Sequence, residues 1–312
     1  MKTVIVLLGP TGVGKTGASI ILAQELKTEI ISADSMQIYR HMDIGTAKPS
    51  AEQRLSVRHH MIDIVDPAEA YSTGRYIAEI VPVIERLHRE GKVPVVVGGT
   101  GLYIKAMTRG LFSGPSSDPE LRSSLLAREG ERKGSLYAYL QEIDPAAAGR
   151  LQRNDIRRII RAIEVCVKSG STMSLSQQER TRPFPYDFIK IGLTRARSEL
   201  YAMIDERVDA MLAQGLLDEV KLLLGMNPDR TPLQAIGYKE IVRFLEHEID
   251  LQEAARLIKR NSRRYAKRQF TWFRQEADIH WVDVTGLHDS GDIAGKIRAA
   301  LREAAGQREQ SA

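Results

Sequence analysis

Residues 3–16 read TVIVLLGPTGVGKT, and this stretch decides the fold. Its first six residues are apolar or β-branched, which is typical of a strand buried in a parallel sheet. Gly9–Thr16 then match G-x-x-x-x-G-K-[ST], and a helical pattern continues to about Leu26. A chance match would be a tight turn only. A strand, this turn and a helix in that order instead indicate a phosphate loop, in which backbone N–H groups and Lys15 surround phosphate oxygens.

The rest of the N-terminal third continues the alternation of short apolar strands and helices. Residues 29–32 and 93–97 predict further strands, and residues 73–90 between them have the apolar spacing of a helix. Such alternation predicts an α/β fold of the P-loop NTPase type, with a parallel sheet flanked by helices. Ligands of these sheets bind at the carboxyl ends of the strands, so we expect the site there.

The pattern changes after Gly110. Helical spacing replaces the alternation until residues 189–193 predict a strand that returns to the sheet. We therefore expect a core made of residues 1–113 and 188–312, interrupted by a mostly helical insertion domain over residues 114–187.

The composition excludes several classes of protein. The 312 residues are 43% hydrophobic and 27% charged, so the chain can bury a core and is not disordered throughout. Its single cysteine, Cys166, rules out an internal disulfide and a cysteine-based zinc site. No apolar run reaches the roughly 18 residues of a membrane helix, so we expect a cytoplasmic protein with no membrane partner. We also expect a monomer. The net charge of +5 is compatible with nucleic acid, and the polar tail beyond Ala304 is expected to fray.

Two residues are candidates for chemistry beside the phosphate loop. Asp34 follows a predicted strand, whereas residues 93–97 lead into Gly-Gly-Thr without a carboxylate, which argues against a motor ATPase. Asp34 could face the acceptor of a group transfer, or it could be a turn residue or helix N-cap. Arg207 lies in the apolar stripe of a predicted helix over residues 198–213. An arginine there either pairs with a core carboxylate or points into a cleft, where it binds an anion such as a diphosphate.

Two clusters of basic residues point to a polyanionic partner. Residues 256–275 contain eight lysines or arginines and no acid: Arg256, Lys259, Arg260, Arg263, Arg264, Lys267, Arg268 and Arg274. A second cluster in the insertion comprises Arg150, Arg153, Arg157, Arg158 and Arg161. A solvated helix face is the alternative for such runs, but a long stretch without acids favours contact with nucleic-acid phosphates.

Several further segments match a known pattern. They are residues 31–40 (ISADSMQIYR), 42–49 (MDIGTAKP), 97–103 (VGGTGLY), 118–119, 154–155, 161–164, 234–238 (QAIGY) and 265–272 (YAKRQFTW). With these and the phosphate loop, the chain resembles the bacterial tRNA dimethylallyltransferases (tRNA isopentenyltransferases) over roughly residues 1–285. The resemblance implies transfer of a dimethylallyl group from its diphosphate to the exocyclic amino group of adenosine 37, in tRNAs that read codons beginning with U.

The resemblance also implies roles for single residues. Asp34 would be the general base on the adenosine amino group, Thr100 would hydrogen-bond the diphosphate, and Arg207 would clamp it. The diphosphate and its Mg²⁺, held by Thr16, would lie on Gly9, Pro10, Thr11, Gly12, Val13, Gly14, Lys15 and Thr16. The positions that match contacts with the anticodon stem-loop of tRNA are Ser35, Met36, Gln37, Arg122, Arg157, Arg158, Ile159, Ile160, Arg161, Gly237, Tyr238, Arg264, Lys267 and Arg268.

One departure and three alternatives remain. The family pattern has Pro-Gln after Asp155, where this chain has Ile156-Arg157, so Arg157 would offer a phosphate or stacking contact in place of a base contact. A small-molecule kinase would bind ATP on the phosphate loop but has no use for the basic run. An adenylate isopentenyltransferase acting on AMP or ADP should lack the basic insertion. A non-catalytic RNA-binding protein would not need Asp34.

Overall fold

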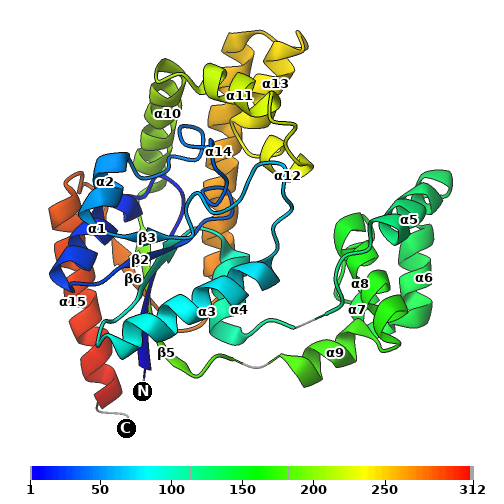
Figure 1. The fold of residues 1–312 in the computed structure, drawn as a ribbon, viewed down its shortest axis with the longest axis horizontal. Helices are drawn as coiled ribbons and strands as arrows, with labels where there is room; N and C mark the ends of the chain where they lie inside the picture. The colour runs from blue at the N-terminus through cyan, green and yellow to red at the C-terminus, as the bar shows by residue number, and fades with distance from the viewer. Residues whose placement is uncertain (1, 113, 182, 310–312) are drawn as a thin grey trace. The chain divides into compact units, whose positions relative to one another are not determined.

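The computed structural model describes residues 2–112, 114–181 and 183–309, which form two compact units (Figure 1). Unit 1 contains the residues up to Ala106 and those from Pro185 on, and unit 2 is Met107–Phe184. The expected insertion, residues 114–187, begins and ends later than unit 2. Its last residues belong to the core because Tyr186 and Asp187 pair with the first strand.

Unit 1 is built on a six-stranded parallel sheet. Its strands, in spatial order, are β3 (His59–His60), β2 (Ile30–Ala33), β4 (Val95–Gly98), β1 (Lys2–Leu8), β5 (Tyr186–Thr194) and β6 (Ile279–Asp283). This sheet, flanked by helices, confirms the predicted P-loop type of α/β fold. The edge strands were not predicted, because β3 has two residues and β6 is mostly half-exposed or exposed.

The register of the sheet brings three chain segments to one level. Leu8 in β1 pairs with Gly98 in β4, and Gly98 also pairs with Ala33 in β2. The next residues along each strand, Gly9, Asp34 and Gly99, therefore leave the sheet together at its carboxyl edge. Gly98 permits this register, since a Cβ there would lie 2.2 Å from the Ala33 carbonyl oxygen.

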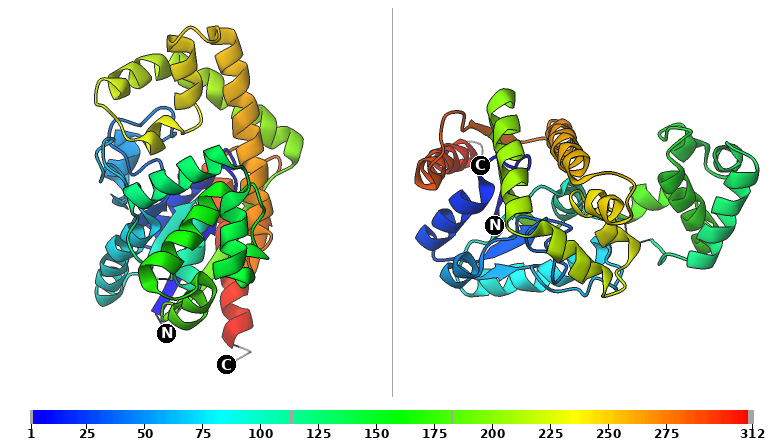
Figure 2. Two further views of the ribbon diagram at one scale, coloured as in Figure 1. Left: turned by 90° about the vertical axis from the view of Figure 1, so that its right-hand side faces the viewer. Right: turned by 90° about the horizontal axis from the view of Figure 1, so that it is seen from above.

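Helices cover both faces of the sheet (Figures 1 and 2). On one face α1 (Lys15–Glu25) packs beside α15 (Ser290–Glu309). On the other lie α3 (Thr73–Arg89) and α4 (Gly101–Arg109), joined by stacked tyrosine rings. The predicted fraying beyond Ala304 was wrong up to Glu309, where α15 ends, and residues 310–312 of the predicted tail lie outside the described residues. No described helix is both long and apolar enough to span a bilayer.

A second core lies between further helices of unit 1. They are α10 (Arg197–Ala213), α11 (Leu216–Leu224), α12 (Arg230–Leu233), α13 (Tyr238–Leu245) and α14 (Leu251–Phe273). Buried side chains of these helices pack with Ile38, Tyr39 and Met42 from the loop after β2. The loop, followed by α2 (Ala51–Ser56), is thus anchored by helices more than 150 residues away in sequence.

Unit 2 consists of short helices among its described residues: α5 (Pro119–Glu131), α6 (Ser135–Ile143), α7 (Pro145–Ala148), α8 (Ile156–Ser169) and α9 (Met173–Arg180). Its core is formed where the apolar faces of α5, α6 and α8 meet. Pro119 and Pro145 each follow an aspartate N-cap, which explains where α5 and α7 begin.

Candidate active site

A cavity of about 370 Å³ lies at the carboxyl edge of the sheet in unit 1. Its walls include Thr11, Gly12, Gly14, Lys15 and Thr16 of the phosphate loop, Asp34 and Gln37 after β2, Gly98 and Gly99 after β4, Arg207 of α10, and Tyr265 and Gln269 of α14. Asp34, Arg207 and the phosphate loop, which sequence reasoning selected separately, therefore meet in one cavity.

The phosphate loop has the backbone that an anion site needs. Gly14 precedes α1 with φ of 103°, and no side chain caps the N–H groups of the first turn. Lys15 Nζ donates to the carbonyl oxygens of Gly9 (2.9 Å) and Pro10 (2.8 Å). Burial lowers the pKa of Lys15 to about 8, although the Asp34 carboxylate opposes this shift. The loop thus presents backbone donors and a cation with an unusually labile proton.

Asp34 is both a turn residue and a cavity residue. Its Oδ1 accepts hydrogen bonds from the backbone N–H of Met36 (2.8 Å) and Gln37 (3.3 Å). No described residue donates a hydrogen bond to Oδ2. One oxygen therefore holds the carboxylate in place, and the other is left to accept a proton from a ligand.

Thr100 supports the segment that carries Asp34. Its Oγ1 accepts a hydrogen bond from the Ser35 N–H (3.0 Å) and donates to Ser35 Oγ (3.4 Å), while its own N–H donates to the Ala33 carbonyl oxygen. The Thr100 hydroxyl is therefore engaged with Ser35 rather than aimed at the phosphate loop.

Arg207 points to the phosphate loop and not to a core carboxylate. Its Nη2 donates to Thr11 Oγ1 (2.7 Å), and its Nε is buried with no hydrogen-bond partner among the described residues. No described acid forms an ion pair with it. Burial lowers the pKa of Arg207, which the Asp34 carboxylate partly offsets. The structure therefore favours an Arg207 that faces a cleft over an Arg207 that pairs with a core carboxylate.

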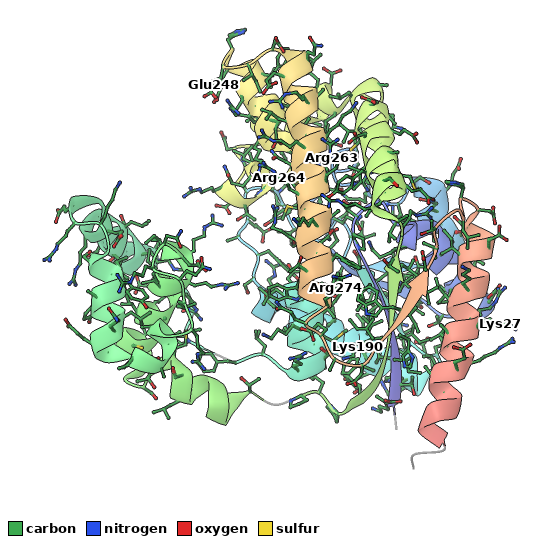
Figure 3. The ribbon with its side chains drawn as sticks, turned by 180° about the vertical axis from the view of Figure 1, so that it is seen from behind. Lys27, Lys190, Glu248, Arg263, Arg264 and Arg274 are labelled. Carbon is green, nitrogen blue, oxygen red and sulfur yellow. The ribbon has the colours of Figure 1, made fainter. Side chains whose placement is uncertain are left out.

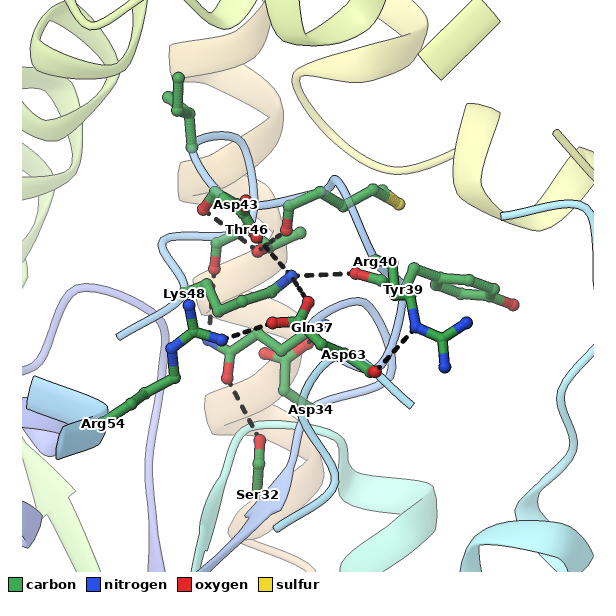
Figure 4. A network of polar contacts seen from close by, with 12 residues as sticks. Ser32, Asp34, Gln37, Tyr39, Arg40, Asp43, Thr46, Lys48, Arg54 and Asp63 are labelled. Carbon is green, nitrogen blue, oxygen red and sulfur yellow. Dashed lines mark hydrogen bonds and ion pairs between the residues drawn. The ribbon is translucent and has the colours of Figure 1, made fainter. Parts of the chain in front are cut away.

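The loop that carries Gln37 is held by a buried lysine (Figure 4). Lys48 Nζ, on a side chain 1% exposed, donates to the Tyr39 carbonyl oxygen (2.9 Å) and pairs with Asp43 and Asp63, each at 2.5 Å. Gln37 accepts a hydrogen bond from the Ser32 hydroxyl and donates to the backbone oxygens of residues 46 and 47. The Gln37 amide thus has one orientation where it lines the cavity.

Glu219 of α11 holds the same loop from its other side. Its carboxylate accepts the backbone N–H groups of Asp43, Ile44 and Gly45 at 2.7–2.9 Å and the Tyr238 hydroxyl at 2.6 Å. Gly237 and Tyr238 are themselves buried. The Tyr238 side chain packs behind the loop and is not exposed, and the implied contact of these two residues with tRNA stays a prediction.

Several residues with an implied tRNA contact lie in unit 2, and the structure shows what surrounds each of them. The side chains of Ile159 and Ile160 are buried in its core, so in this segment the exposed side chains that could meet tRNA are those of the arginines. The guanidinium groups of Arg122 and Arg161 both bond the buried Glu164 carboxylate. Exposed basic side chains at the start of α8 are those of Arg157 and Arg158, the latter 3.5 Å from Asp155.

Some basic residues of α14 form ion pairs, and others are exposed to solvent. Arg256, Lys259 and Arg263 pair with Glu253, Asp209 and Asp205 respectively. Figure 3 shows Arg263 on the side of α14 toward α10 and Arg264 on the opposite side. Arg264, Lys267 and Arg268 are exposed and have no acidic partner among the described residues. We call these three the basic face of α14.

Comparisons with known proteins agree with this geometry. A family model described as IPP transferase matches residues 37–276. The tRNA dimethylallyltransferase of Thermodesulfovibrio yellowstonii is 52% identical, over 97% of this chain and 98% of the relative. That of Thermotoga maritima is 46% identical, over 95% and 96%. This chain belongs to the tRNA dimethylallyltransferase family.

Solved structures of the tRNA dimethylallyltransferase family have the same fold. The full-length tRNA isopentenylpyrophosphate transferase of Bacillus halodurans superposes with a TM-score of 0.72 at 40% identity, over 99% of this chain and 100% of that one. A eukaryotic dimethylallyltransferase acting on tRNA gives a TM-score of 0.80 at 32% identity, over 96% and 78%. The family resemblance drawn from the sequence is confirmed.

Tyr265 and Gln269 are among the residues of the cavity wall that were not predicted as site residues from the sequence. Gln269 is 6% exposed and shares the inner side of α14 with Ala266 and Phe273. The available signal was its position, three and four residues from those apolar side chains. A polar amide on the apolar face of a helix needs a buried partner.

Proposed function

We propose that this chain transfers a dimethylallyl group from dimethylallyl diphosphate to the exocyclic amino group of adenosine 37 in tRNAs that read codons beginning with U, and releases diphosphate. The observation that supports this most is the single cavity that holds Asp34, Lys15, Thr16 and Arg207. A carboxylate suits an amine acceptor, and the cations suit a diphosphate leaving group.

The acceptor needs Asp34 because an adenine amino group is a weak nucleophile. Its lone pair is delocalised into the ring, and the nitrogen becomes acidic only as the new C–N bond forms. A carboxylate that takes the proton at that point contributes about 10²–10⁴-fold. The free Oδ2 of Asp34 is placed for this, since Oδ1 is held by two backbone N–H groups.

The donor needs positive charge on its leaving group. As the allylic C–O bond breaks, charge builds up on the diphosphate, where Lys15, the first turn of α1 and Arg207 would stabilise it. The Thr16 hydroxyl would hold Mg²⁺, which neutralises diphosphate charge when bound. No group of three His, Cys, Asp or Glu among the described residues could hold a metal, and this suits an ion whose ligands come mostly from substrate phosphates and water. Thr100 would turn its hydroxyl from Ser35 to the diphosphate.

The acceptor base must leave its stack to reach the cavity. Extruding a nucleotide costs a few kcal/mol, which backbone and pocket contacts must offset. Ser35, Met36 and Gln37 would line the base pocket beside Asp34. The basic face of α14, with Arg157 and Arg158 of unit 2, would contact the phosphates of the anticodon stem-loop. We also propose that the chain acts as a monomer in the cytoplasm, together with its tRNA.

Product analysis tests the function directly. The protein is mixed with Mg²⁺, dimethylallyl diphosphate and an unmodified tRNA that has adenosine beside its anticodon, and the digested nucleosides are weighed by mass spectrometry. We expect dimethylallyl-adenosine from tRNA and none from AMP run in parallel. Product from AMP would indicate an adenylate isopentenyltransferase. No product together with tight ATP binding would indicate a kinase.

Diphosphate binding is expected to weaken as the pH rises above about 8. The pKa of Lys15 is lowered to about 8 by burial, so a growing fraction of the free protein has a neutral amine there, and an anion must bind together with a proton. The affinity for inorganic diphosphate should fall toward tenfold per pH unit between pH 8 and 9.5, measured by calorimetry. The Lys15→Arg variant, whose cation does not titrate, should lack this dependence. An equal pH dependence in both proteins would contradict the assignment.

The basic face of α14 is expected to set the salt dependence of tRNA binding. Replacing Arg264, Lys267 and Arg268 together by glutamine removes up to three phosphate contacts. The slope of log K against log salt should then become shallower by about 2–3, because each contact contributes about 0.7–0.9. Arg302→Gln on α15 is the control for loss of an exposed charge. An unchanged slope in the triple variant would mean that this face is merely solvated.

A further inference from the structure

Gln269 of α14 joins two segments of the site through the two ends of one amide. Its Oε1 accepts the backbone N–H of Thr11 in the phosphate loop (2.8 Å), and its Nε2 donates to the carbonyl oxygen of Gly99 after β4 (2.9 Å). The side chain is 6% exposed, so both bonds are shielded from water. Each end of the amide therefore has its matching partner.

The fit around Gln269 is close. A Cβ at Gly99 would lie 2.2 Å from Gln269 Nε2, so glycine is needed for this approach. Leu8 and Gly98 are paired in the sheet, but Gly9 and Gly99 leave it in separate loops. The pairing of β1 with β4 ends at Leu8 and Gly98. Thr100 is bonded to β2 through its N–H and the Ala33 carbonyl oxygen, whereas Thr11 lies beyond the end of β1. The Gln269 amide supplies the cross-link that the strands cannot.

Thr11 is consequently held from two helices. Gln269 of α14 bonds its N–H, and Arg207 of α10 bonds its hydroxyl at 2.7 Å. With its N–H occupied, Thr11 offers no backbone donor to a phosphate. Its part in the site is to fix the start of the phosphate loop, so that Arg207 and the N–H groups around Lys15 keep one spacing.

Together these contacts give Gln269 a function beyond packing. On the basis of the proposed function, we propose that Gln269 is a positioning residue, which sets the distance between the diphosphate held on the phosphate loop and the Gly99–Thr100 segment beside Asp34. It is thereby a determinant of donor alignment. It is not a tRNA contact, because it lies on the inner side of α14, away from the basic face.

Two substitutions test the hydrogen bonds of Gln269 to Thr11 and Gly99. Gln269→Met keeps the length of the side chain and removes both hydrogen bonds. Gln269→Glu keeps the acceptor for the Thr11 N–H, but its ionised form loses the donor to Gly99 and adds negative charge beside the diphosphate. Protonation of that carboxyl restores the donor, and its buried position against a carbonyl oxygen raises its pKa.

We expect Gln269→Met to lower kcat for prenyl transfer by about 10–100-fold, because small misplacements of reacting groups have effects of this size. The KM for dimethylallyl diphosphate should rise, and the Kd for tRNA should stay within twofold. In Gln269→Glu, kcat/KM relative to wild type should recover several-fold as the pH falls from 8 to 6. Gln252→Met, an exposed glutamine in the first turn of α14, is the matched control and should behave as wild type.

Two results would overturn the role of Gln269. One is kcat and KM within twofold of wild type in both variants; the other is a parallel loss of tRNA affinity and activity with no recovery at low pH. If Gln269→Met does not fold, the pH profile of Gln269→Glu decides. Inorganic diphosphate binding, measured by calorimetry, is the readout that separates this role from the proposed function. It should weaken in Gln269→Met even if wild type makes no prenylated tRNA, and unchanged binding there would contradict the role.

Discussion

Replacing Asp34 by asparagine is expected to lower turnover by about 10²–10⁴-fold, while tRNA affinity changes little. The asparagine Oδ1 can still accept the N–H groups of Met36 and Gln37, so the turn is retained. What the variant lacks is an oxygen that takes a proton from the adenosine amino group. Single-turnover rates of tRNA prenylation measure the loss, and filter binding measures tRNA affinity.

The control for Asp34 is another strand-end aspartate. Asp283 closes β6, and its Oδ1 accepts the N–H of Thr285 at 2.9 Å in the same kind of turn. It lies outside the walls of the cavity, so Asp283→Asn should keep wild-type turnover. Loss of tRNA binding in Asp34→Asn would instead assign Asp34 to positioning the base. Full activity in that variant would exclude a general base at this position.

Removing the charge of Glu164 is expected to destabilise unit 2 by about 3 kcal/mol. Glu164 is fully buried and accepts bonds from the Asp118 N–H (2.7 Å), from Arg122 (2.8 and 2.9 Å) and from Arg161. The Glu164→Gln variant leaves two guanidinium groups facing an amide, and breaking a buried ion pair costs about 3–5 kcal/mol. The lower end applies here because both arginines reach solvent.

Acid should have the same effect as this substitution. Burial alone would raise the pKa of Glu164, but the bonds from Arg122, the Asp118 N–H and Arg161 outweigh it and lower the pKa to about 2. Because the pKa of Glu164 is lower in the folded protein than in the unfolded chain, the ionised carboxylate stabilises the fold at pH values above 4.5, the unfolded-state pKa. This stabilisation is lost as the pH falls toward 2, the folded-state pKa. The stability of unit 2 should therefore decline between those values.

Hydrogen exchange of the α8 amides measures this stability locally, which a whole-chain melting curve does not do for two units. Glu142→Gln, an exposed glutamate of α6, should leave exchange unchanged. Equal protection in Glu164→Gln and wild type would mean that the network orders Arg122 and Arg161 without stabilising unit 2.

Local patterns made the core of the site predictable. The phosphate loop lies between a strand and a helix that its own neighbours specify, and Asp34 follows a strand with a clear apolar run. The register of β1, β2 and β4 then places both at one edge. Contiguous motifs of this kind depend on backbone geometry within about ten residues, so the sequence contains all that determines them.

Residues whose role depends on a distant partner were not predictable in this way. Arg263 and Arg264 are adjacent in one basic run, yet Arg263 pairs with Asp205 on α10 and Arg264 faces solvent. Tyr238 and Ile159 lie in segments that resemble tRNA contacts and are nevertheless buried. Gln269 lies in the segment 265–272 that resembles the family pattern, but nothing in that segment indicates its two partners, which come from loops 170 and 258 residues away.

The sequence by itself determined the family, the phosphate loop, the candidate carboxylate Asp34 and the number of basic residues. Only the tertiary structure decided which basic residues remain free to meet a polyanion, and which polar side chain joins the two loops of the site. The physical reason is that an ion pair or a buried hydrogen bond depends on the distance between groups in space, and separation along the chain does not specify that distance.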